Sequence, residues 1–202
     1  SKATEELEEL GAVIYEGHSA DNITNPDLVV YTAAVNDSNP EMQRAKELGI
    51  ATVSRAEMLG RIMKNYQKAI SVAGTHGKTT TSPLIAWLNH ACDCGGNAFL
   101  GGISKNFNGN MVLGEGNRLA VEADEFDRSF LRLKPDVAVI TAVAADHLDI
   151  YGTFEAVVEA FGQFAALIKQ GGHLILKQGV EIALPTEGVN IWRYSYDEPC
   201  DF

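Results

Sequence analysis

The stretch that most constrains this fold is a glycine loop between a predicted strand and a predicted helix. An apolar run at residues 69–73 predicts a buried strand, and residues 78–90 predict a helix. Between them the chain reads Gly74-Thr75-His76-Gly77-Lys78-Thr79-Thr80. A strand, a glycine loop and a helix in this order are typical of a phosphate-binding loop.

Each residue type in the loop suits that chemistry. Gly74 and Gly77 lack a β-carbon, so the backbone can turn tightly and present its amide groups to an anion. The helix that follows directs its positive end at the same place. Lys78 is then placed to reach a terminal phosphate, and the Thr79 hydroxyl to bind the Mg²⁺ that accompanies a nucleotide. The usual pattern G-x-x-x-x-G-K-[ST] is not met, because Val72 stands where its first glycine would be, and the alternative is a turn that merely starts a helix.

Composition excludes several classes of function. The formal net charge of -11 argues against nucleic-acid binding, which requires a basic face. With no apolar run near ~18 residues and no charged region ahead of an apolar segment, we expect neither a membrane span nor a signal peptide. The three cysteines (Cys92, Cys94 and Cys200) lack zinc-type spacing and fit reduced thiols in a cytoplasmic protein.

Strands and helices alternate over the first seventy or so residues. Strands are predicted at residues 12–15, 28–32 and 50–53, and the capping residues Asn39 and Ser54 precede predicted helices. This order predicts an α/β fold with parallel sheets flanked by helices. A polar segment at residues 64–68 predicts a boundary between domains at residues 1–67 and 68–202. The glycine-rich stretch at residues 95–116 is predicted to be irregular, and residues 189–196 an edge strand.

Two further segments carry candidate chemistry. An apolar strand at residues 119–121 ends in Glu122 and Asp124, either of which is a candidate magnesium ligand; the alternative is a solvated strand end. Another apolar strand, at residues 137–141, leads to Asp146-His147 and Asp149. A lone histidine is most often structural, but its place after a parallel strand and beside two aspartates favours a ligand role for His147.

Together these segments resemble the Mur ligase family, the ATP-dependent amino-acid ligases of peptidoglycan synthesis. The resemblance covers nearly the whole chain, and the combination of motifs is more specific than any one of them. The matching segments are residues 74–80, Glu122-Ala123-Asp124-Glu125 with Asp127 and Ser129-Phe130, residues 145–152, Asn39-Pro40-Glu41, residues 55–59 and Gly101-Gly102.

The resemblance implies the later part of a Rossmann-like UDP-sugar domain at residues 1–67 and a truncated central ATPase domain at residues 68–202. The implied substrates are UDP-N-acetylmuramate and L-alanine. The sugar carboxylate attacks the γ-phosphate of ATP, and the amine of alanine displaces phosphate from the resulting acyl phosphate. The loop residues 74–80 would bind ATP, with Lys78, Glu122 and His147 catalytic and with Thr79, Glu122 and His147 as ligands of Mg²⁺. Without the family's third domain, the chain alone is expected to be inactive.

One departure and three alternatives accompany this interpretation. The family usually shows Thr-Asn-x-Glu or Thr-Asn-x-Asp ahead of the Asp-His pair, whereas this chain reads Thr141-Ala142-Val143-Ala144, which lacks polar support for the metal site. The alternatives are a sister ligase for another amino acid, a folylpolyglutamate-type ligase and a non-catalytic nucleotide-binding module. The sequence does not indicate an oligomeric state.

Overall fold

A computed structural model describes residues 2–202 of the chain. By its contacts the chain forms two compact units, Ser1–Arg55 and Ala56–Phe202. Most of helix α3 (Arg55–Met63) therefore belongs to the second unit, although the sequence places it in the first predicted domain.

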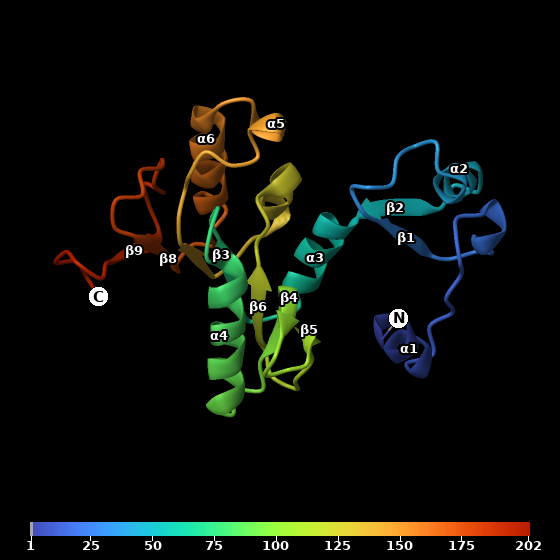
Figure 1. Cartoon of the computed structure of the whole chain (residues 1–202), viewed down its shortest axis with the longest axis horizontal. Helices are drawn as coiled ribbons and strands as arrows, with labels where there is room; N and C mark the ends of the chain where they lie inside the picture. The colour runs from blue at the N-terminus through green and yellow to red at the C-terminus, as the bar shows by residue number, and fades with distance from the viewer. Residues whose placement is uncertain (1) are drawn as a thin grey trace. The chain divides into compact units, whose positions relative to one another are not determined.

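The first unit is small and contains one pair of parallel strands (Figure 1). Strands β1 (Leu28–Tyr31) and β2 (Ala51–Ser54) pair in parallel, as expected, and α2 (Pro40–Glu47) connects them. The other elements of this unit are α1 (Lys2–Glu9) and the 3-10 helix η1 (Ala20–Asn22). The strand predicted at residues 12–15 is wrong: the segment is irregular and exposed, and no described strand pairs with it.

A partly exposed hydrogen-bond network fixes the beginning of α2. The Asn39 side chain accepts hydrogen bonds from the backbone amides of Glu41 and Met42, so it caps the helix. The Glu41 carboxylate in turn accepts a bond from Asn22 at 2.6 Å and lies 2.8 Å from the His18 ring. Burial alone would raise the pKa of Glu41, but the hydrogen bonds from His18 and Asn22 hold that pKa below its usual value.

The second unit is a seven-stranded sheet in the order β5-β4-β6-β3-β7-β8-β9. All neighbouring strands are parallel except β4 and β5, which confirms the predicted α/β class. Its elements after α3 are β3 (Lys68–Ala73), α4 (Lys78–Ala91), β4 (Asn97–Ser104), β5 (Gly109–Val112), β6 (Arg118–Glu122), η2 (Phe126–Arg132), β7 (Val137–Ile140), α5 (Leu148–Tyr151), α6 (Phe154–Ala165), β8 (Gly172–Lys177) and β9 (Val189–Tyr194).

Two hydrophobic clusters lie on opposite faces of this sheet. Leu119 and Val121 of β6 belong to the larger cluster, which also contains Phe161 of α6. Ala120, between them in sequence, belongs to a smaller cluster with Ala86 of α4. Because successive side chains of a strand point to opposite faces, α4 and α6 cover different faces of the sheet.

The glycine-rich stretch at residues 95–116 is not irregular, and that prediction was wrong. It forms β4 and β5, an antiparallel pair with a turn in which Asn108 adopts a left-handed conformation (φ 52°). Glycines at Gly101, Gly102 and Gly109 obscure the alternation that would have indicated strands. The predicted strand near the end of the chain is confirmed as β9, at one edge of the sheet.

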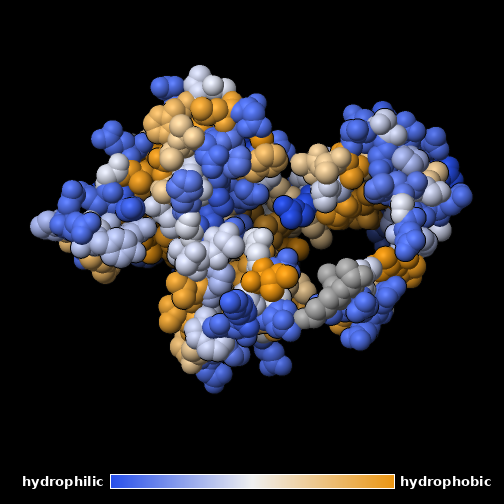
Figure 2. Space-filling model, in the orientation of Figure 1, coloured by the Kyte–Doolittle hydropathy of each residue, from blue (hydrophilic) through white to orange (hydrophobic). Residues whose placement is uncertain are grey.

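The surface is mixed in character. Figure 2 shows hydrophilic groups over much of the visible face, with apolar side chains reaching the surface near α4, where Leu84 and Leu88 are exposed. Cys92, Cys94 and Cys200 are free thiols. Among residues 2–202, no helix combines the length and the apolar character needed to cross a bilayer.

Candidate active site

The predicted phosphate loop follows the central strand of the sheet. Strand β3 lies between β6 and β7, ends at Ala73, and is followed after four residues by the start of α4 at Lys78 (Figure 1). Gly74 has a φ of +138°, and a β-carbon at this position would lie 2.2 Å from the Thr141 hydroxyl oxygen. Only glycine therefore allows the loop to lie this close to the segment after β7.

The amino end of α4 is open to an anion. Its N-cap residue, Gly77, is left-handed (φ 86°) and makes no side-chain capping bond. The Lys78 and Thr79 amides have no partner within the helix, whereas those of Thr80 and Thr81 bond to the Gly77 carbonyl. The Thr75 hydroxyl is buried and has no hydrogen-bond partner in the described part of the chain. Unpaired amides and a buried hydroxyl at a helix N-terminus fit a phosphate group.

Lys78 is held by a buried carboxylate. Its ammonium group donates to the Gly74 carbonyl at 2.7 Å and to Oε1 of Glu125 at 2.8 Å, and lies 2.6 Å from Oε2 of the same residue. The Glu125 side chain is only 1% exposed. The positive charge that the loop offers to a phosphate is therefore partly neutralised from within the protein.

Thr79 and Glu122 meet directly. The register of the parallel strands sets Glu122 beside Val72, so the carboxyl end of β6 lies next to the start of the loop. The Thr79 hydroxyl donates to Oε1 of Glu122 at 2.8 Å. Oε2 accepts bonds from the Ser82 hydroxyl at 3.1 Å and the Gly101 amide at 3.0 Å. Hydroxyl and carboxylate oxygens are the ligands that Mg²⁺ prefers, so the donor set fits that ion.

His147 lies on the other side of the buried carboxylate. It occupies the N-cap position of α5 with a left-handed backbone (φ 52°). Its Nε2 atom is 3.9 Å from Oε1 of Glu125, and its ring meets Phe126 edge to face. No contact between His147 and Glu122 or Thr79 is found within residues 2–202, and no group of three or more His, Cys, Asp or Glu side chains there is arranged to hold a metal.

The structure thus brings the predicted residues together in two neighbouring groups. One contains Thr79 with Glu122, and the other contains Lys78 and His147 on either side of Glu125. Sequence reasoning missed Glu125 as a site residue, although it lies inside the quoted carboxylate motif. The signal was its position three residues after Glu122, past a strand end, where the 3-10 helix η2 turns its side chain back under the loop.

Tyr151 forms a hydrogen bond with the backbone of Glu125. Its hydroxyl group donates to the Glu125 backbone carbonyl at 2.6 Å, and the side chain is 6% exposed. Burial raises the pKa of Tyr151 to about 12, so the hydroxyl remains a hydrogen-bond donor at neutral pH.

The segment with the unusual alanines contributes backbone atoms. The Ala142 carbonyl accepts a bond from the Thr75 amide at 3.0 Å, and the Thr141 hydroxyl contacts the carbonyls of Ala73 and His76. The methyl groups of Ala142 and Ala144 offer no polar atom to a metal or its ligands. The segment therefore shapes the loop without adding a side-chain donor at these two positions.

A glycine loop between a central parallel strand and a helix, with a paired lysine and a threonine held by a carboxylate, defines a phosphate-loop nucleotide-binding domain. Comparison with known families identifies which kind. The chain belongs to the Mur ligase family: the family description "Mur ligase family, catalytic domain" matches residues 1–67, and "Mur ligase middle domain" matches residues 72–201.

Individual relatives agree with this assignment. The chain is 45% identical to a UDP-N-acetylmuramate--L-alanine ligase from Phocaeicola vulgatus over 98% of its length, but spans 45% of that ligase. The crystal structure of UDP-N-acetylmuramate-alanine ligase from Thermotoga maritima matches with a TM-score of 0.77 and 32% identity, covering 89% of this chain and 41% of that one. A UDP-N-acetylmuramate:L-alanyl-gamma-D-glutamyl-meso-diaminopimelate ligase from Neisseria meningitides shares the fold, with a TM-score of 0.80 at 22% identity, covering 94% of this chain and 68% of that one.

Proposed function

We propose that this chain provides the ATP-binding part, and a portion of the UDP-sugar-binding part, of a ligase that joins L-alanine to UDP-N-acetylmuramate in peptidoglycan precursor synthesis. Residues 1–67 would belong to the UDP-sugar domain and residues 68–202 to the ATPase domain. A cytoplasmic location fits these substrates. The relatives named for this reaction support the choice of substrates.

The observation that carries the proposal is that the loop contacts two carboxylates: Glu122, at the end of β6, and Glu125, three residues later. Lys78 lies against Glu125, and Thr79 lies against Glu122. These contacts place a cation and a hydroxyl-carboxylate pair beside an open helix N-terminus, which is the set of groups that phosphoryl transfer requires.

In the proposed reaction, the residues mainly position and neutralise charge. The loop at residues 74–80 would bind the phosphates of ATP, through the Lys78 and Thr79 amides and not the Thr75 amide, which is bonded to Ala142. Lys78 would offset charge on the γ-phosphate as the sugar carboxylate approaches. The carboxylate forms a bond to that phosphorus while the bond to ADP breaks. The amine of alanine then adds to the acyl phosphate, loses a proton, and expels inorganic phosphate to leave the amide.

Thr79 and Glu122, which contact each other, would hold Mg²⁺, and His147 is proposed as a further ligand from the family resemblance. The ion would supply positive charge against the triphosphate. In this structure His147 lies beside Glu125, with its Nε2 atom 3.9 Å from Oε1 of that residue.

Release of ADP tests the proposal. It should be measured for this chain alone and for a polypeptide that also supplies the remaining length of its relatives, with UDP-N-acetylmuramate and each of several amino acids. We expect release that depends on both the UDP-sugar and L-alanine in the longer polypeptide only, and its loss in the Lys78→Ala variant. Release stimulated equally by another amino acid would indicate a sister ligase, and release independent of the sugar would contradict the proposal.

A further inference from the structure

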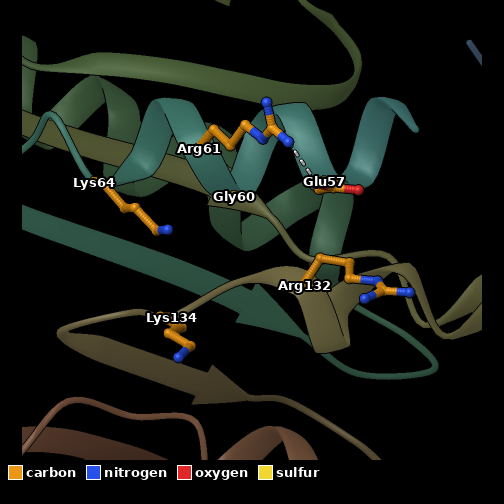
Figure 3. A pocket seen from close by; sticks show the side chains of 6 residues that line it. All are labelled: Glu57, Gly60, Arg61, Lys64, Arg132 and Lys134. Carbon is orange, nitrogen blue, oxygen red and sulfur yellow. Dashed lines mark hydrogen bonds and ion pairs between the residues drawn. The ribbon is translucent and has the colours of Figure 1, made fainter. Parts of the chain in front are cut away.

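A second collection of positive charge lies away from the phosphate loop. Six residues line a hollow of about 280 Å³: Glu57, Gly60, Arg61, Lys64, Arg132 and Lys134. We refer to it as the basic hollow. Figure 3 shows Arg61 on α3, Lys64 just after the end of that helix, and Arg132 and Lys134 on the segment that leads into β7. Four of the chain's 16 lysines and arginines thus gather at one concavity of a protein with a net charge of -11.

The hollow lies at the amino ends of the parallel strands, and the phosphate loop lies at their carboxyl ends. Lys64 precedes the start of β3, and Lys134 precedes the start of β7, which pairs with β3 in parallel. The phosphate loop follows the other end of β3. The hollow is therefore a separate place on the protein, and what it binds does not depend on the function proposed for the loop.

The charges in the hollow are poorly compensated. Arg61 pairs with Glu57 at 2.8 Å, four residues earlier on α3. Within the described residues, no carboxylate forms an ion pair with Lys64, Arg132 or Lys134. Four cations and one carboxylate, Glu57, line the hollow, so it carries an excess of positive charge, which raises the local potential and attracts anions.

The walls of the hollow are fixed by close backbone packing. Gly60 is buried in α3, and a β-carbon there would lie 2.3 Å from the backbone oxygen of Arg132. Helix α3 therefore packs directly on the segment that carries Arg132. Because the two backbones are in contact, the segments that carry the basic side chains are held at a fixed separation. This preorganisation reduces the entropy lost when an anion binds.

We propose that the basic hollow binds a small anion carrying one or two phosphate groups. Arginine presents a planar fork that matches phosphate oxygens, and lysine adds a compact positive charge. The volume, about 280 Å³, lies just below the range of about 300–1,000 Å³ for small-molecule sites, which suits a compact anion. A nucleic-acid strand is disfavoured, because the chain as a whole carries a net charge of -11, which repels a long polyanion.

Titration with inorganic phosphate and with pyrophosphate, followed by amide NMR of the full chain, tests the proposal. The Gly60 amide reports on the hollow and the Gly77 amide on the phosphate loop, so the two sites are distinguished in one experiment. We expect the Gly60 signal to shift and saturate with pyrophosphate, to shift more weakly with phosphate, and to lose affinity as NaCl is added. A Gly60 signal that does not move while Gly77 does would overturn the proposal.

Charge variants provide the second arm. Lys64→Gln with Lys134→Gln should weaken pyrophosphate binding at Gly60 about tenfold or more, since two charge-assisted contacts are removed. Lys105→Gln with Lys177→Gln removes the same charge from exposed sites elsewhere and should leave the midpoint within about twofold, the change expected from net charge alone. Equal losses in the two double variants, or equal affinity for citrate, would show a response to charge alone and refute a phosphate site.

Discussion

The ammonium nitrogen of Lys78 lies 2.6 Å from Oε2 of Glu125, a carboxylate with 1% of its side chain exposed. The lysine that the sequence assigns to a phosphate is therefore already engaged by an internal counter-ion. A phosphate that binds the loop must share Lys78 with this carboxylate or displace it. Glu125 and the phosphate therefore compete for Lys78.

We predict that Glu125→Gln strengthens nucleotide binding. The substitution keeps the size of the side chain and one acceptor oxygen but removes a negative charge next to the loop, so the affinity for ATP should rise about tenfold, corresponding to ~1.4 kcal/mol. Isothermal titration of the full chain with ATP measures it.

Asp124→Asn is the matched control, because this neighbouring carboxylate is exposed and does not contact Lys78. It should change the affinity less than Glu125→Gln does. Weaker binding in Glu125→Gln would mean that the carboxylate holds Lys78 in its binding position instead of competing for it.

The role of Glu122 can be separated from its structural contacts. Its carboxylate accepts hydrogen bonds from Thr79, Ser82 and the Gly101 amide. Ser82 retains the Lys78 carbonyl as an acceptor, but Glu122→Ala leaves the other two donors unpaired and should lower the free energy of unfolding by about 1–3 kcal/mol. Glu122→Gln retains an acceptor oxygen and should fold nearly normally. If Glu122 binds Mg²⁺, both variants should nevertheless need a higher Mg²⁺ concentration for ATP binding. An unchanged requirement in Glu122→Gln would return this residue to a purely structural role.

The sequence predicted the parts of this site that depend on local pattern. A glycine loop after an apolar strand places Lys78 and Thr79 by itself, because the strand, turn and helix are consecutive. The sequence also named Thr79 and Glu122 as candidate magnesium ligands, but their direct contact depends on the position of β6 beside β3, which local pattern does not predict.

The remaining contacts depend on tertiary structure that periodicity does not encode. Glu125 reaches Lys78 because the chain beyond β6 stays beside β3, where the Ala123 amide bonds to the Val72 carbonyl, and then turns at Glu125 into η2. Residues 12–15 are apolar enough for a strand, but a strand needs a hydrogen-bonding neighbour, and the described chain supplies none there. The hairpin of β4 and β5 was hidden by glycines whose lack of side chains removes the alternation.

Tyr151 gives a prediction for alkaline pH. Its pKa in the folded protein is about 12, above its ordinary value of 10, because burial disfavours the phenolate. The protonated phenol therefore stabilises the fold at pH values below 10, and this contribution is lost as the pH rises toward 12.

Tyr151→Phe removes the hydroxyl donor and leaves the Glu125 carbonyl without this partner, so it should cost about 1–3 kcal/mol at neutral pH. Urea unfolding at pH 7 and at pH 11 measures both effects. The difference between wild type and variant should shrink at the higher pH. A constant difference would show that ionisation of Tyr151 is not linked to folding.

Gly60 gives a prediction whose sign opposes helix propensity. Glycine to alanine inside a helix ordinarily stabilises a protein by up to ~1 kcal/mol. At Gly60 the added carbon would lie 2.3 Å from the Arg132 backbone oxygen, and a backbone atom cannot move aside cheaply. Gly60→Ala should therefore destabilise the second unit by about 1–3 kcal/mol, as overpacking does. Gln163→Ala, at an exposed position of α6, should stay within about 0.5 kcal/mol of wild type. Thermal and urea unfolding of both variants measures the contrast, and a gain in stability for Gly60→Ala would show that α3 does not pack on the Arg132 segment as described.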